Sequence, residues 1–105
     1  MDVQCIAKTG KENVWIYAKD LHSGGNITID SATFEVFDAD GSSVQGSASA
    51  TLADNGTATP DVYGLVDCTA SGFTAGEYYE VQFLVTIGAE IFDHRVHIKC
   101  VEKKS

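Results

Sequence analysis

The side chains in this sequence that could do chemistry include three histidines, and their spacing argues against a catalytic centre. His94 and His97 are three residues apart in a segment that alternates as a strand, so they point to opposite faces and cannot converge on one metal ion or substrate. His94 points inward in that register, at the core or its rim, whereas His97 shares the solvated face with Asp93 and Arg95. The third histidine, His22, falls in a predicted loop at residues 22–26. The chain has no GxSxG, HExxH or glycine-rich phosphate-loop motif, and we therefore predict no catalytic residues and no enzyme.

Cysteine is the second candidate nucleophile or metal ligand. Cys5, Cys68 and Cys100 are odd in number, so at least one is unpaired, and no CxxC pair is present. Each lies in an apolar, strand-like context, where a free cysteine acts as a small hydrophobic residue. We expect buried thiols. The alternative is a bridge between Cys5 and Cys100, which would lie on neighbouring strands and would require an oxidising compartment.

Acidic residues give the remaining candidate site, at Asp38-Ala39-Asp40-Gly41-Ser42. Alternate carboxylates of this kind open calcium-binding loops, but the bidentate Glu needed about twelve positions from the first Asp is absent. Turn formation explains the segment better, because Asp bonds to its own backbone and Gly accepts a positive φ. We predict no metal site and no cofactor, with a weak site shared with Asp54 or Asp61 across loops as the alternative.

Length and charge limit the other possibilities. The chain has 105 residues, which fits a single domain spanning 1–105. Seven basic and fifteen acidic residues give a net charge of −8, which repels phosphate backbones, so we predict no nucleic-acid binding. No apolar run approaches the roughly 18 to 20 residues needed to cross a bilayer, and residues 1–7 lack the features of a secretory signal. We therefore expect neither membrane insertion nor a signal peptide.

The elements that must position these residues alternate with a period of two. This pattern predicts strands with inward apolar faces, separated by turns rich in Gly, Asp and Asn. The expected strands are residues 3–7, 13–20, 31–38, 43–52, 61–70, 77–87 and 90–101. The segment 43–52 is small and polar, so we expect a weakly packed or edge strand there. The fold class is all-β, an antiparallel sandwich of six to eight strands.

Two segments carry a family resemblance. Residues 31–41, an alternating strand followed by an Asp-rich turn, resemble bacterial and phage immunoglobulin-like domains of the fibronectin III or BIg-like kind. Tyr63-Gly64 and the stretch 74–86, a glycine turn with an aromatic and then alternating Val and Phe, resemble the later strands of such domains. The resemblance implies an immunoglobulin-like β-sandwich, in which Tyr78 or Tyr79 would serve as the tyrosine corner. The chain departs from antibody domains because it has no Cys…Trp…Cys spacing.

A short, acidic, single domain of this type also resembles small phage structural proteins, such as head-decoration or tail accessory modules. That resemblance implies a place in the virion and a role in assembly, rather than an activity.

Five aromatic residues fall on the faces opposite the predicted core and form a candidate interaction surface. Exposed aromatic side chains mark contact surfaces because they bury a large area at low entropic cost. The alternatives are that one strand faces the other way or that loops cover these rings. The candidate residues are Trp15, Tyr17, Phe37, Tyr63 and Tyr78.

These observations favour a non-enzymatic structural or interaction module. The first hypothesis is a virion accessory protein that binds a protein partner or assembles with itself through outward apolar residues and strand edges. The second is a carbohydrate-binding or adhesion module, in which Trp15 and Tyr17 would stack on a glycan. The third hypothesis is an enzyme, which would require a cryptic active site that no motif in the sequence reveals.

Overall fold

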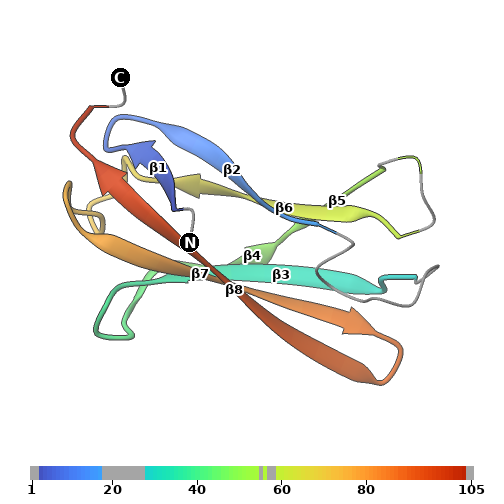
Figure 1. The fold of residues 1–105 in the computed structure, drawn as a ribbon. Helices are drawn as coiled ribbons and strands as arrows, with labels where there is room; N and C mark the ends of the chain where they lie inside the picture. Colours follow the sequence, from blue (N-terminus) through green and yellow to red (C-terminus); the bar gives the residue numbers. More distant parts are fainter. Residues whose placement is uncertain (1–2, 18–27, 55, 57–58, 104–105) are drawn as a thin grey trace.

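The computed structural model describes residues 3–17, 28–54, 56 and 59–103, and it is built from β-strands (Figure 1). Expected strand residues 18–20 and the expected loop at 22–26, including His22, lie outside the described residues. The eight strands are β1 (Gln4–Ala7), β2 (Lys11–Ile16), β3 (Ser31–Phe37), β4 (Ser43–Ser49), β5 (Thr51–Ala53), β6 (Asp61–Asp67), β7 (Tyr78–Ile87) and β8 (Glu90–Val101).

The strands form two packed sheets, as the all-β prediction required. One sheet has five strands in the order β1-β8-β7-β3-β4, and the other has three in the order β2-β6-β5. The prediction of a purely antiparallel sandwich was wrong, because β1 pairs with β8 in parallel. Alternation within a strand reports which face is buried but carries no information on the direction of its neighbour, so this pairing was not readable from the sequence.

The expected single strand at 43–52 is two strands in different sheets. β4 pairs with β3, and β5 pairs with β6 after the chain crosses between the layers at Ala50. The backbone N–H of Ala50 still donates to the carbonyl of Ala32 on β3, at 2.9 Å, just before the crossing. β4 joins β3 through register shifts around Val36, which are β-bulges or irregularities that bend an edge strand.

The core consists of the inward faces predicted for the long strands. On β7, alternate residues from Tyr79 to Val85 are buried, and their outward neighbours are half-buried or exposed. Gly64 on β6 lies under Phe34, whose ring stacks on Phe83 at 6.0 Å between centroids. The buried apolar side chains are Ile6, Val14, Ile16, Ile29, Ala32, Phe34, Val36, Val62, Val66, Cys68, Phe73, Tyr79, Val81, Phe83, Val85, Ile98 and Cys100.

The corner between β6 and β7 is fixed by two aromatic residues. Tyr79 is buried, and its hydroxyl accepts a hydrogen bond from the backbone N–H of Thr74 at 2.6 Å. Phe73 is also buried and packs against Tyr79 with ring centroids 4.7 Å apart. Tyr78 or Tyr79 was expected to serve as the tyrosine corner. Tyr79 makes the hydrogen bond to the backbone, whereas Tyr78 is exposed.

All three cysteines are free thiols. β1 and β8 are neighbours, as the alternative bridge required, but Cys5 lies opposite Lys99 while Cys100 lies opposite Ile6. Successive residues of a strand point to opposite faces, so Cys5 and Cys100 face away from each other and a bridge between them is excluded. Cys68 and Cys100 are buried, and their thiols are close enough to hydrogen-bond.

Candidate functional site

The outer face of the three-stranded sheet carries a cluster of three aromatic side chains, Trp15, Tyr17 and Tyr63, which we call the aromatic face. Trp15 on β2 is directly opposite Tyr63 on β6, and their ring centroids are 4.5 Å apart. Tyr17 is two residues further on the same side, and its ring is nearly parallel to that of Trp15, at 8° and 6.4 Å. Trp15 and Tyr17 point outward because Val14 and Ile16, which alternate with them, are buried. Tyr63 points outward because its neighbour Val62 is buried.

Exposure distinguishes the aromatic face from core packing. Trp15 is 36% exposed and Tyr17 is 47% exposed, while Tyr63 is half-buried between its neighbours. Leu65, exposed on the same face, extends the apolar surface along β6. Such a cross-strand aromatic pair stabilises the sheet by about 0.2–1 kcal/mol. The aromatic face is therefore an ordered apolar surface open to solvent.

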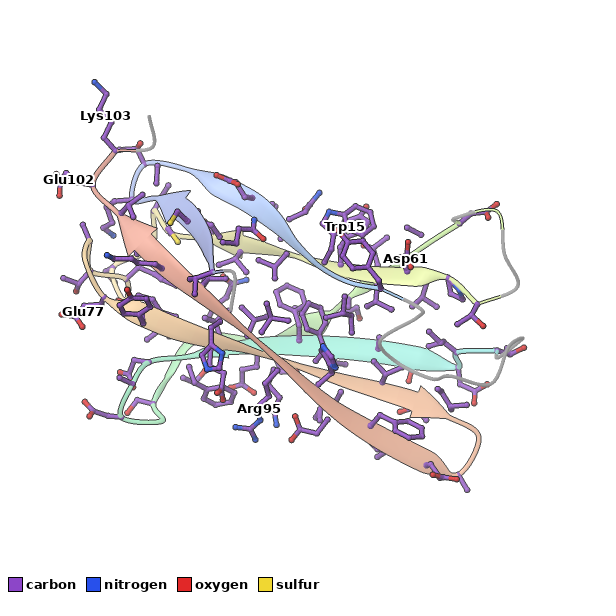
Figure 2. All side chains as sticks on the ribbon, viewed as in Figure 1. Trp15, Asp61, Glu77, Arg95, Glu102 and Lys103 are labelled. Atoms are coloured by element: carbon purple, nitrogen blue, oxygen red, sulfur yellow. The ribbon has the colours of Figure 1, made fainter. Side chains whose placement is uncertain are left out.

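Polar residues border the aromatic face along the same two strands. Lys11 and Asp67 are directly opposite each other at one end, with Nζ and Oδ2 3.9 Å apart. Asp61 lies at the other end of β6, and Figure 2 shows it on the same outer side of the molecule as Trp15. The pKa of the Asp67 carboxyl lies below its ordinary value because the hydroxyl and backbone N–H of Thr69 donate to it. An apolar centre with a charged rim is the usual anatomy of a protein contact.

Phe37 and Tyr78, the other two predicted surface residues, lie on the opposite side of the molecule. They line a concave site of about 530 Å³ on the outer face of the five-stranded sheet. Phe37 is half-buried, and Tyr78 is 53% exposed with Nζ of Lys99 5.1 Å from its ring centroid. The five candidates thus fall into two separate groups, because β2 and β6 belong to one sheet and β3 and β7 to the other. The sequence did not predict this division, because alternation along a strand does not say which sheet the strand joins.

Arg95 organises the floor of this concave site. Its Nη1 donates to Oε1 of Glu80 at 2.7 Å, and its Nε donates to Oδ1 of Asp93 at 3.1 Å. His97 approaches the other oxygen of Glu80 at 3.3 Å, and Gln82 donates to Asp93 at 2.9 Å. The guanidinium beside it holds the pKa of Asp93 below its ordinary value, with a smaller effect from Gln82. The two carboxylates in turn raise the pKa of Arg95.

The sequence predicted one part of this charged network and not the other. The alternation of β8 placed Asp93, Arg95 and His97 on one face, but their pairing with Glu80 and Gln82 depends on the register between β7 and β8. Arg95 is therefore occupied by neighbouring carboxylates. Figure 2 shows it on the side of the molecule opposite Trp15.

The remaining chemical candidates do not form a site among the residues that the structure describes. Oδ1 of Asp38 accepts the backbone N–H groups of Asp40 and Ser42, both at 2.9 Å, so this segment is a turn. His94 and His97 lie on opposite faces of β8. Within the described ranges, no three His, Cys, Asp or Glu side chains come together to hold a metal ion. The same residues include no helix long and apolar enough to cross a membrane.

Comparisons with known proteins add no relative to this picture. No family model, curated protein or solved structure matches the chain.

Proposed function

We propose that this chain is an immunoglobulin-like β-sandwich that acts as a non-enzymatic structural module, assembling with further copies of itself as an accessory (head-decoration or tail) protein of a phage virion. The aromatic face is the observation that carries the proposal. It presents Trp15 and Tyr17 to solvent side by side, and the residues that dominate the binding energy at protein contacts are enriched in Trp and Tyr.

The division of the strands supports the immunoglobulin-like part of the proposal. With β2 to β8 taken as strands B, C, C′, D, E, F and G, one sheet holds B, E and D and the other holds G, F, C and C′. Immunoglobulin-like domains divide their strands in this way, and their tyrosine corner lies where Tyr79 bonds to Thr74. β1 departs from the simplest pattern because it pairs with β8 instead of β2.

The placement of the polar residues supports a structural role over a catalytic one. The charged side chains at the concave site satisfy one another, with Arg95 held between Glu80 and Asp93. The virion assignment rests on the resemblance of the sequence to small phage structural proteins, and the aromatic face supplies the contact surface that such a role needs.

Solution mass tests this proposal. Light scattering on the full chain, with reductant and over a concentration series, is expected to show species larger than the monomer at a defined stoichiometry. Trp15→Ser should reduce the size of the assembly, whereas Lys103→Ser, an exposed residue outside the aromatic face and its rim, should leave it unchanged. Wild-type protein that stays monomeric over the whole range would contradict self-assembly.

A carbohydrate-binding or adhesion module is the second candidate, and the near-parallel rings of Trp15 and Tyr17 favour it. Two flat rings at 8° to each other make a platform on which the apolar faces of sugar rings could stack. Trp15 is the one tryptophan of the chain, so its fluorescence reports directly on such binding. Saturable quenching by a glycan, abolished in Tyr17→Ser, would favour this function over self-assembly.

A further inference from the structure

The concave site on the outer face of the five-stranded sheet has no part in the self-assembly proposed above. Its volume of about 530 Å³ is that of an ordinary small-molecule site. A second hollow of about 330 Å³ adjoins it, and the two share Asp38, Ala39, Tyr78 and Tyr79. Together the two hollows form what we call the outer groove, whose length suits a ligand of more than one ring.

One wall of the outer groove is the turn between β3 and β4, which is held by its own hydrogen bonds. Oδ1 of Asp38 accepts the backbone N–H groups of Asp40 and Ser42. The backbone N–H of Gly41 donates to the carbonyl of Asp38 at 3.0 Å. Figure 1 shows this turn projecting on the side of the five-stranded sheet that faces away from the three-stranded sheet. The wall is therefore formed before any ligand binds, which lowers the cost of binding.

Two aromatic side chains give the outer groove its apolar surface. Phe37 at the end of β3 lies opposite Glu80 of β7, and Tyr78 is two residues before Glu80 on the same face of β7. Phe37 is half-buried and Tyr78 is 53% exposed, and both line the groove. A ligand lying in the groove therefore meets aromatic ring surface, which packs well against the C–H faces of sugar rings.

The polar floor of the outer groove offers both donors and acceptors. The bonds from Arg95 to Glu80 and Asp93 use three of the five N–H groups of its guanidinium. Gln82 uses one N–H for Asp93, at 2.9 Å, and it has a second N–H and a carbonyl oxygen. Within the described part of the chain, neither Arg95 nor Gln82 bonds to any other side chain. Their remaining groups suit hydroxyl groups, each of which donates and accepts.

The ion pairs of the floor disfavour a charged ligand. An anion would have to compete with two carboxylates for Arg95, in a chain whose net charge is −8. A cation would have to displace the same guanidinium from Glu80, and it would meet the ammonium of Lys99, whose Nζ lies 5.1 Å from the ring centroid of Tyr78. A neutral ligand breaks neither ion pair. The electrostatics therefore favour a neutral molecule rich in hydroxyl groups.

We propose that the outer groove binds a neutral saccharide, with its C–H faces against the two aromatic rings and its hydroxyl groups on the polar floor. This binding is a further activity of the chain and does not depend on self-assembly. It also differs from the second candidate function, which places a glycan on Trp15 and Tyr17. Figure 2 shows Trp15 and Arg95 on opposite sides of the molecule.

Saturation-transfer nuclear magnetic resonance on the full chain tests the proposal, because it observes the ligand and works for a protein of any assembly size. The probes are maltose, lactose, mannobiose and N,N′-diacetylchitobiose, each titrated to about 100 mM. At least one is expected to bind with a Kd of about 0.1–10 mM, since two rings and a few polar groups hold it in an open site. No saturable signal from any of the four would overturn the proposal.

Variants assign the binding to the outer groove. Tyr78→Ser removes one ring and should raise the Kd about tenfold, whereas Tyr78→Phe keeps the ring and should change it less than about threefold. Ile91→Ser is the matched control, because Ile91 is 67% exposed on the same face of β8 as Arg95 but does not line the groove. Its Kd should equal that of the wild type. A Tyr78→Ser protein that binds as tightly as Ile91→Ser would overturn the proposal.

Two readouts separate this proposal from the functions proposed above. The fluorescence of Trp15 should stay constant during the titration, because Trp15 lies on the opposite side of the molecule. Quenching of Trp15, together with binding that survives Tyr78→Ser, would place the saccharide on the aromatic face and refute binding in the outer groove. A chain that is monomeric by light scattering but loses saccharide binding in Tyr78→Ser would refute self-assembly and support the groove.

Discussion

Gly64 is the position at which the packing of the two sheets is most easily tested. It lies on the inner face of β6, and a Cβ atom built there would be 2.6 Å from Cδ1 and Cγ of Phe34 and 2.8 Å from Cδ2. Ordinary contact begins at 3.4 Å, so the ring of Phe34 must move by almost an ångström. That ring is buried and stacked on Phe83, so it has little room to move. Overpacking of this kind costs about 1–3 kcal/mol.

Gly64→Ala should therefore lower the melting temperature by roughly 5–20 °C, because a domain of this size loses about 4–8 °C per kcal/mol. The assay is thermal and urea unfolding followed by circular dichroism and Trp15 fluorescence. Gly46→Ala is the matched control: it also lies in a strand, and a Cβ there meets nothing within 4 Å, so its stability should change by no more than about 0.5 kcal/mol.

A second variant identifies the cause. Adding Phe34→Leu to Gly64→Ala makes room beneath the strand, and the combined loss should be smaller than the sum of the two single losses. Gly64→Ala protein as stable as Gly46→Ala would refute the packing described for this part of the core.

Three further predictions concern the corner between β6 and β7, the loss of stability at acid pH and the reactivity of the thiols. Tyr79→Phe removes the acceptor for the Thr74 N–H and should cost about 1–3 kcal/mol in urea unfolding, whereas exposed Tyr78→Phe should cost little. The pKa of Asp67 is lower in the folded chain than in the unfolded chain, so its contribution is present above the unfolded value and is lost as pH falls through the folded one. Stability measured from about pH 5 to about pH 2 should therefore fall less steeply in Asp67→Asn than in the wild type, and equal slopes would contradict the Thr69 bonds. Burial and the neighbouring Cys100 raise the pKa of Cys68 to about 12, so a thiol reagent should label Cys5 alone in the native protein and all three cysteines in denaturant.

Much of the fold was readable from local alternation. The inward positions of β7 and β8 were predicted because Val and Phe alternate there with polar residues over ten or more positions. The boundaries of β8 agree with the predicted strand for the same reason. Turn chemistry at Asp38 and Gly88 was equally clear, because the Asp38 side chain accepts nearby backbone N–H groups and Gly88 tolerates a positive φ.

The rest depends on contacts between distant parts of the chain. β4 and β5 were merged because the small polar residues from Ser43 to Thr51 have no apolar face to mark the crossing at Ala50. Phe73 lies in a corner without periodicity, so its burial against Tyr79 was not visible.

The residues of the candidate site were predicted from the sequence, but their arrangement in space was not. Tyr63 joins Trp15 and Tyr17 only because β2 pairs with β6, whereas Phe37 and Tyr78 belong to the other sheet. The short length of β1 and its parallel pairing with β8 were not predicted either, because alternation encodes neither.

Solution mass is the measurement that tests the central claim most directly. Light scattering on the full chain, at neutral pH with reductant and over a concentration series, should show assemblies larger than the monomer at a defined stoichiometry. A single monomeric species at every concentration would contradict a self-assembling structural module.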